Sequence, residues 1–303
     1  MLKNIVLSGG SVKSISFIGA LQALYERNML QDVTRYICSS GGSIIGVLMT
    51  MGFSPATILE NILKVVDIYE QLDVDVEAVL GIVENFGIEN GDFFINWIKT
   101  KVRETFKIPE MTDLTFLEFA KLTGKDLVIC ASDIIDRKSV FFSLDKTPNT
   151  SVFEAIRASM AIPLIMVPVR IDDALYVDAA LFNNFPMNFF DTLNQENICC
   201  VSTCGFCIVQ SVDTHIPKIQ QIENLNIVSY MSLILGTMVD RCNLPTKVTK
   251  NENDTHIVKI CIDDDPNKFM SFDMTTFKFV MDKDLFSKYH KIGYDATIQQ
   301  LDI

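Results

Sequence analysis

The chain has 303 residues, of which 49% are hydrophobic and 21% charged, and its formal net charge is −12. Its Lys and Arg residues form no patch, which argues against nucleic acid as a partner and against strong attraction to anionic lipid. Any contact with a membrane would therefore have to rest on apolar side chains. No uninterrupted apolar run reaches about 18 residues, so we expect no membrane-spanning helix.

The N-terminus and the cysteines favour a cytosolic protein. The first four residues lead straight into an apolar strand, without the charged start and long apolar segment of a secretory signal. Eight cysteines in such a chain are expected as reduced thiols. The C-x-x-C formed by Cys204 and Cys207 is expected in a buried strand rather than in a redox or zinc site, and the acidic triplet at 263–265 in a solvated turn. We expect a cytoplasmic protein, at most peripheral at membranes, with neither metal nor cofactor.

Two strand-loop-helix units are predicted in the first fifty residues. An apolar strand at residues 4–7 precedes a loop of small residues at 8–14, and the helix that follows has apolar residues at helical spacing from Phe17 onwards. A second strand ends near Cys38 and runs directly into an apolar helix. Successive units of this kind predict a parallel sheet with helices on its faces.

The rest of the chain alternates between predicted helices and short apolar strands. Residues 55–107 are expected to be helical, with breaks near Asp73 and Gly91. The later elements are a helix after the capping box at Thr115, strands at 126–131 and 140–144, a helix after the capping box at Ser151, and a hairpin over 167–177 that turns at Asp172-Asp173. Without repeats or a low-complexity linker, residues 1–303 are expected to form a single domain.

The second predicted strand and helix meet in a stretch of serines and glycines with the pattern of a nucleophile elbow. In such a turn the serine has a strained backbone and small neighbours, and the positive end of the new helix lies beneath it. Ser40 fits this position best, because the small Cys38 and Gly42 then occupy the two crowded sites. Ser39 would instead place the bulky Ile37 at the first of them. Cys38 stands where the G-x-S-x-G pattern has glycine.

An acyl-transfer site also needs donors for a developing oxyanion. Gly9 and Gly10 follow the first strand, and their amides, with that of Ser11, lie just before a helix whose N-terminus favours negative charge. A glycine pair in this place suits a phosphate as well as an oxyanion, although the P-loop pattern is absent.

The general base has two kinds of candidate. His215, His256 and His290 all follow Asp178, so the order Ser, Asp, His is formally available. None of these histidines lies in an obvious active-site loop. The alternative is a carboxylate, and Asp178 is placed at the end of a predicted strand among small residues.

Four motifs occur in a fixed order along the chain. They are LSGGSVKS with FIGAL at 7–14 and 17–21, CSSGG at 38–42, RASMAIP at 157–163 and YVDAALFNNFP at 176–186. In this order the chain resembles the patatin-like phospholipases, whose patterns are G-G-G-x-R/K-G, G-x-S-x-G, R-A-S-x-A-I-P and D-G-G/A, and a closing helix at 289–299 is also similar. The resemblance implies an α/β fold, a patatin-like three-layer α/β/α arrangement with a mostly parallel central sheet.

The resemblance also implies a mechanism. Ser40 would be the nucleophile and Asp178 the base of a Ser-Asp dyad without histidine, and the amides of Gly9, Gly10 and Ser11 would hold the oxyanion. The reaction implied is calcium-independent hydrolysis of acyl esters, of the phospholipase A type, through an acyl-enzyme. The substrate would be a phospholipid or another lipid ester at a membrane or micelle surface.

Other parts of the chain have open or partial assignments. Lys13 stands where the family often has Arg, and contact with a headgroup phosphate and anchoring of its own loop both remain open. The helical region 55–107 would form the acyl-chain groove or a lid. The sequence identifies no activating protein partner.

Four small-residue positions depart from the family pattern, namely Ser11, Ser14, Cys38 and Ala179 in place of glycines. A Cβ at positive φ costs roughly 1 kcal/mol or more. Since the dyad is retained, we expect Ser11, Cys38 and Ala179 to have negative φ. Two alternatives to a phospholipase remain open: a catalytically degenerate patatin fold that binds lipid or protein, and an esterase or thioesterase with a soluble substrate.

Overall fold

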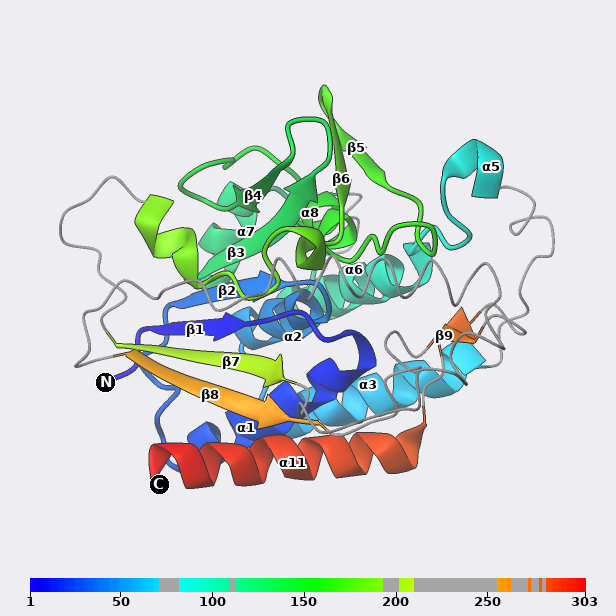
Figure 1. The fold of residues 1–303 in the computed structure, drawn as a ribbon. Helices are drawn as coiled ribbons and strands as arrows, with labels where there is room; N and C mark the ends of the chain where they lie inside the picture. The colour runs from blue at the N-terminus through cyan, green and yellow to red at the C-terminus, as the bar shows by residue number, and fades with distance from the viewer. Residues whose placement is uncertain are drawn as a thin grey trace.

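A computed structural model describes residues 1–70, 82–108, 113–192, 202–209, 255–262, 272–273, 278–279 and 282–303 of the chain. Figure 1 shows the helices and strands that these residues form. The chain forms, in order, β1 (Asn4–Leu7), the 3-10 helix η1 (Ser11–Ser14), α1 (Ile15–Glu26), β2 (Arg35–Ser39), α2 (Gly41–Thr50), α3 (Pro55–Glu70), α5 (Ile82–Asn85), α6 (Asp92–Phe106), α7 (Phe116–Thr123), β3 (Asp126–Asp133), β4 (Lys138–Phe142), α8 (Val152–Ser159), β5 (Val169–Ile171), β6 (Ala174–Val177), the 3-10 helices η2 (Ala179–Leu181) and η3 (Met187–Thr192), β7 (Thr203–Val209), β8 (Thr255–Cys261), β9 (Phe272–Asp273), β10 (Lys278–Phe279) and α11 (Lys283–Leu301).

Eight of the described strands form one mixed sheet. Seven follow the order β5-β6-β3-β2-β1-β7-β8, and β4 pairs with β3 (Figure 1). β1 lies between β2 and β7, and the strands from β3 through β2, β1 and β7 to β8 are parallel to one another. The strands β4, β5 and β6 are antiparallel to their neighbours. This is the α/β fold with a mostly parallel sheet that the sequence predicts.

The antiparallel strand β6 occupies the place beside β3 that β2 leaves free at its end. Ser132 of β3 pairs with Ser139 of β4 on one edge and with Val177 of β6 on the other. β2 pairs with the earlier part of β3 on the edge opposite β4, and its last residue is Ser39. β6 therefore continues the line of β2, and the segment after β6 meets the turn between β2 and α2.

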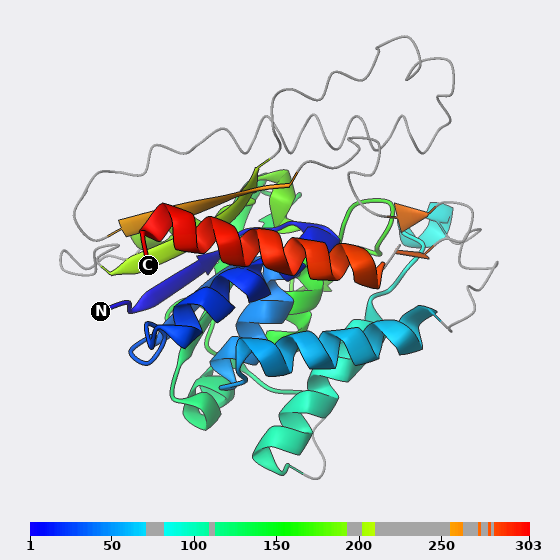
Figure 2. The same ribbon diagram turned by 90° about the horizontal axis from the view of Figure 1, so that it is seen from below.

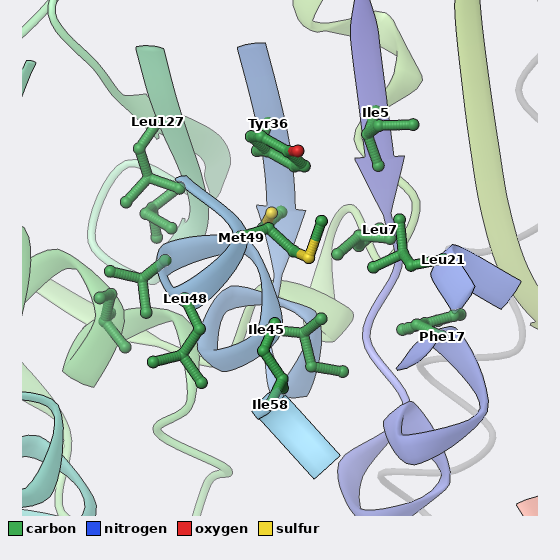
Figure 3. Close-up of a cluster of buried hydrophobic side chains, with 14 of the residues drawn as sticks. Ile5, Leu7, Phe17, Leu21, Tyr36, Ile45, Leu48, Met49, Ile58 and Leu127 are labelled. Atoms are coloured by element: carbon green, nitrogen blue, oxygen red, sulfur yellow. The ribbon is translucent and has the colours of Figure 1, made fainter. Parts of the chain in front are cut away.

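Side chains alternate between the two faces of the sheet, and each face has its own apolar cluster. Ile5 and Leu7 of β1 belong to one cluster, together with side chains of α1, α2, α3, α6, α7, α8 and α11. Val6 and Ile37 belong to the other, which includes Phe189 of η3. Figure 3 shows the first cluster, in which Ile5 and Leu7 lie near side chains of α1 and α2. Each such large side chain contributes roughly 1.5–3 kcal/mol when it is fully buried.

The last described helix packs on the first through two glycines. A Cβ on Gly19 of α1 would overlap the carbonyl oxygen of His290, and a Cβ on Gly293 of α11 would overlap the carbonyl oxygen of Ser16. The two backbones therefore touch where the helices cross, and they lie side by side in Figure 2. Only glycine allows this separation.

Most of the predicted elements in the described ranges are confirmed. Thr115 forms a capping box at the start of α7, and the Ser151 hydroxyl accepts a backbone N–H at the start of α8. The helical region contains α3, α5 and α6, and Gly91 immediately precedes α6. The strand expected at 140–144 begins two residues earlier, at Lys138. The predicted break near Asp73 lies outside the described residues, and among those described no helix is long and apolar enough to span a bilayer.

The close crossing of α1 and α11 predicts that a glycine-to-alanine change in a helix will destabilise the protein. Replacing a glycine by alanine inside a helix normally stabilises it by about 0.5–1 kcal/mol. Gly293→Ala should instead destabilise the protein by about 1–3 kcal/mol, because the new methyl group meets backbone that cannot move aside. Urea unfolding measures the difference, with the exposed Lys291→Ala as the control on the same helix. A Gly293→Ala protein as stable as the wild type would contradict this packing.

Candidate active site

Ser40 occupies the sharp turn between β2 and α2. Its backbone has φ 49° and ψ −130°, a conformation that costs a non-glycine residue on the order of 1–3 kcal/mol. Ser40 is also the N-cap of α2, so the positive end of that helix lies directly beneath it. The strand, the strained serine and the helix together have the geometry of a nucleophile elbow.

Asp178 follows β6 and faces Ser40. The Ser40 hydroxyl donates to Asp178 Oδ2 at 2.6 Å, although the two residues are 138 positions apart. The Ala180 N–H donates to the other carboxylate oxygen at 2.8 Å. The Asp178 N–H in turn donates to the carbonyl of Ala161 at 2.8 Å. Both carboxylate oxygens thus have a donor, and one of the donors is the candidate nucleophile.

The environment of Asp178 suits a base. The residue is only 4% exposed, and its burial raises the pKa of the carboxyl to about 6, while the hydrogen bonds from Ser40 and Ala180 oppose this rise. A carboxylate with a raised pKa takes up a proton more readily than an ordinary one, yet it is mostly ionised at neutral pH.

The described histidines belong to other parts of the fold. His256 is exposed on β8, the last strand in the order of the described sheet. His290 belongs to α11, where its carbonyl contacts Gly19 of α1. His215 lies outside the described residues. The hydrogen-bonded partner of Ser40 is therefore a carboxylate.

The loop between β1 and η1 lies against the elbow, but one of its amides is already engaged. The Gly9 N–H donates to the carbonyl of Asn184 at 2.9 Å. The expectation that Gly9 supplies an oxyanion donor does not hold in this conformation, because its only N–H points to that carbonyl. Gly9 instead permits close approach, since a Cβ there would come within 2.9 Å of the Ser40 Cβ. Gly10 and Ser11 follow it at the start of η1.

Three of the four substituted glycine positions are expected to have negative φ, and these three differ in backbone conformation. Ser11 has φ 48°, so the expectation of negative φ is wrong at this residue. Cys38 lies in β2 and Ala179 in η2, and neither has positive φ. Space for Cys38 is provided by Gly46 of α2, where a Cβ would overlap the cysteine sulfur. A glycine on the facing helix α2 thus makes room for the cysteine that replaces a glycine in β2.

Lys13 is buried in η1, with 6% of its surface exposed. Its neighbours Val12 and Ser14 line the cavity beside Ser40, whereas Lys13 does not. A cation that met a headgroup phosphate would need to reach that cavity or the solvent. The structure therefore favours the anchoring of the loop over contact with a substrate.

An apolar cavity of about 110 Å³ lies beside Ser40. Its walls include Val66 of α3, Phe94 and Trp97 of α6, and Phe286 of α11. Among the described residues that line it, the polar side chains are serines and none is charged. Such a cavity takes an apolar chain and leaves a charged group outside.

Sequence reasoning assigned no role to two groups that hold the elbow. The Ser159 hydroxyl accepts the Ser40 N–H at 2.8 Å and lies 3.2 Å from the Ser43 hydroxyl. The Asn183 carbonyl accepts the Ser39 hydroxyl at 3.2 Å. Their signal is present in the sequence, because both belong to the motifs at 157–163 and 176–186.

No group of three or more His, Cys, Asp or Glu side chains suited to a metal ion occurs in the described ranges. Cys204 and Cys207 both lie in β7, as expected for a strand. Their odd spacing places them on opposite faces of the sheet, so they do not form a redox or metal-binding pair. Cys199, Cys200 and the acidic triplet at 263–265 fall outside the described residues.

Comparison with known proteins places the chain in a family. Residues 5–191, more than half of the chain, match the patatin-like phospholipase family. The probable lipid hydrolase 463L of Invertebrate iridescent virus 6 is 29% identical over 189 residues, which are 61% of this chain and 62% of that protein. The uncharacterized protein R571 of Acanthamoeba polyphaga mimivirus is 28% identical over 199 residues, or 63% and 62% of the two chains. The chain thus spans about three fifths of the length of these curated relatives.

A solved structure has the same fold. VipD from Legionella pneumophila aligns with 99% of this chain and 67% of its own, with a TM-score of 0.55 and 16% sequence identity. At this identity the likeness concerns the fold alone. On the match over residues 5–191, the chain belongs to the patatin-like phospholipase family.

Proposed function

We propose that this protein is a calcium-independent lipid acyl hydrolase of the phospholipase A type. The observation that carries the proposal is the 2.6 Å hydrogen bond from the Ser40 hydroxyl to the buried Asp178 carboxylate. Membership of the patatin-like phospholipase family supports a lipid ester as the substrate. The apolar cavity beside Ser40 supports an acyl chain as the part that is bound.

The proposed reaction proceeds through an acyl-enzyme. Asp178 takes the hydroxyl proton as Ser40 Oγ attacks the ester carbonyl, and the oxyanion is held by the amides of Gly10, Ser11 and Gly41 near the N-terminus of α2. Collapse of the tetrahedral intermediate breaks the ester bond, and the leaving alcohol receives the proton from Asp178. A water molecule, deprotonated by the same carboxylate, then releases the fatty acid and restores Ser40.

The two ends of a lipid substrate, its acyl chain and its headgroup, have different places in this proposal. The acyl chain lies in the cavity between α3 and α6, within the region 55–107, against side chains such as Val66 and Trp97. Because no charged side chain of the described lining faces it, the headgroup stays outside, at the surface of a membrane or micelle. A phospholipid and other lipid esters both satisfy this arrangement.

A second candidate is a degenerate fold that binds lipid or protein without turnover. Two observations favour it: the amide of Gly9 is engaged by Asn184, and Ser11 carries a Cβ at φ 48° in the same loop. Both weaken the supply of oxyanion donors. The intact dyad favours the hydrolase.

Removal of either dyad member should abolish hydrolysis. Ser40→Ala and Asp178→Asn should each lower acyl release from phospholipid micelles by roughly 10³-fold or more, because nucleophile and base act as one unit. The assay contains EDTA, in which wild-type activity should persist. The control is Ser16→Ala, a change at another buried serine, which lies in α1. Wild-type activity in Ser40→Ala would refute the dyad mechanism. Loss of the wild-type enzyme's activity in EDTA would refute its calcium independence.

Hydrolysis should depend on the ionised form of Asp178. Since burial raises the pKa of this carboxyl to about 6, kcat/KM should be level above pH 7 and should fall tenfold for each pH unit well below pH 6. The measurement is a profile of acyl release from pH 4.5 to 8.5, with unfolding monitored at each pH. A limb with a midpoint near pH 4, the range of an exposed aspartate, would contradict the role of a buried base.

The two candidates differ in the effect of Ser11→Gly. If the Cβ at φ 48° displaces the loop amides, glycine should raise turnover by up to roughly 10²–10³, the worth of one oxyanion donor. If the amides are already in place, Ser11→Gly should leave kcat and KM as in the wild type. Cys38→Gly is the matched control, because Cys38 has no positive φ and should give no gain in turnover. A wild type with no more activity than Ser40→Ala, together with activity in Ser11→Gly, would establish the degenerate reading.

A further inference from the structure

Ser159, the last residue of α8, reaches the backbone of the candidate nucleophile. Its hydroxyl accepts the Ser40 N–H at 2.8 Å, and the Ser43 hydroxyl lies 3.2 Å away. Ser159 is fully buried, so no solvent water accepts the Ser40 N–H in place of the Ser159 hydroxyl. The contact joins residues that are 119 positions apart and serves none of the strand pairs of the sheet.

This hydrogen bond restrains the part of Ser40 that the reaction depends on. The N–H direction fixes the peptide plane between Ser39 and Ser40, and rotation from that plane by φ sets the direction of the side chain. Ser40 holds φ at 49°, a value that the chain does not adopt without restraint. An acceptor at its N–H therefore helps to define where Oγ points.

The segment that follows α8 also contacts the candidate base, Asp178. Two residues after Ser159, the Ala161 carbonyl accepts the Asp178 N–H at 2.8 Å. The turn is closed by its own backbone, because the Ala161 N–H donates to the carbonyl of Ala158 at 3.2 Å. One short segment at the end of α8 thus contacts the backbones of both dyad members.

The segment is anchored at its beginning and borders the cavity at its end. Arg157 donates through Nη2 to the carbonyl of Val167 at 2.7 Å and through Nε to the carbonyl of Asn90. Met160 and Ile162 line the apolar cavity. Residues 157–163 therefore link the nucleophile, the base and the acyl cavity, and the mechanism above gives them no part.

We propose that Ser159 is a positioning residue that holds Ser40 in its reactive conformation, and that residues 157–163 align nucleophile and base as one unit. The inference rests on the proposed function, since it concerns the reactivity of Ser40 Oγ. Ser159 neither lines the cavity nor donates to the Asp178 carboxylate. Its effect therefore falls on the rate of bond formation at Ser40 and leaves substrate binding and the pKa of the base unchanged.

The test is the rate at which a fluorophosphonate labels Ser40. In this reaction Ser40 Oγ forms a bond to phosphorus, fluoride leaves, and the hydroxyl proton passes to Asp178. Ser159→Ala should lower the second-order rate constant about 10- to 100-fold, while the final stoichiometry stays at one label per chain. Ser16→Ala is the matched control, because its buried hydroxyl has no hydrogen-bond partner in the described part of the chain, and it should label like the wild type.

The kinetics of ester hydrolysis provide a second measurement on the same variants. Ser159→Ala should lower kcat by a similar factor, with KM and the midpoint of the pH profile unchanged. A purely structural role would reduce the fraction of labelled chains and leave the rate constant of the remainder as in the wild type.

Each outcome decides between these roles. An unchanged labelling rate constant in Ser159→Ala overturns the proposal, whether or not the labelled fraction falls. If Ser159→Ala does not fold, Ser159→Cys carries the same comparison, because a thiol has a similar shape but is a weak acceptor. A wild type in which Ser40 is not labelled at all would refute the proposed function instead, and so the two failures are distinguishable.

Discussion

The positive φ of Ser40 is the constraint to which the rest of the site is fitted. A serine does not remain at φ 49° unless the surrounding structure holds it there. β2 fixes the chain before it through parallel pairing with β1 and β3, and α2 fixes the chain after it. The Ser39 hydroxyl and the Ser40 N–H are both bonded to segments more than a hundred residues away. The free energy of the buried sheet offsets the strain of one residue.

Asp178 adds a second cost, and this one depends on pH. Burial raises its pKa from 3.8 to about 6, so the ionised form is disfavoured in the folded protein. Between those two pH values the folded chain keeps a proton that the unfolded chain has lost. Stability therefore falls as pH rises through this window and stays lower above it, by an amount on the order of 2–3 kcal/mol. The group that would act as base is also one that the fold would hold more easily if it were neutral.

The sequence predicts the chemical groups of the site better than it predicts their contacts. Ser40 and Asp178 carry recognisable signals, because a serine between a strand and an apolar helix and an aspartate at a strand end are local patterns. The helix starts at Thr115 and Ser151 are local as well. The engagement of the Gly9 amide has no such signal, since its partner Asn184 is 175 positions away.

A motif also does not show when a residue in another element makes room for a larger side chain. Cys38 departs from the elbow pattern, yet the space that it needs is supplied by Gly46, one turn into the buried part of α2. Ser11 departs in the same way and has no comparable relief, because its backbone remains at φ 48°. Both substitutions look alike in sequence, and only the backbone conformation separates them.

The crossing of α1 and α11 has a consequence for biosynthesis. Beside the two glycines, the Tyr294 hydroxyl donates to the Glu26 carboxylate across 268 positions of sequence. At a translation rate of about 5–20 residues per second, α1 waits some tens of seconds on the ribosome before α11 exists to cover it. During that time its apolar surface is open to chaperones and to other nascent chains. α1 thus completes its packing only after α11 has been synthesised, so this layer of the fold depends on a contact between segments far apart in the sequence.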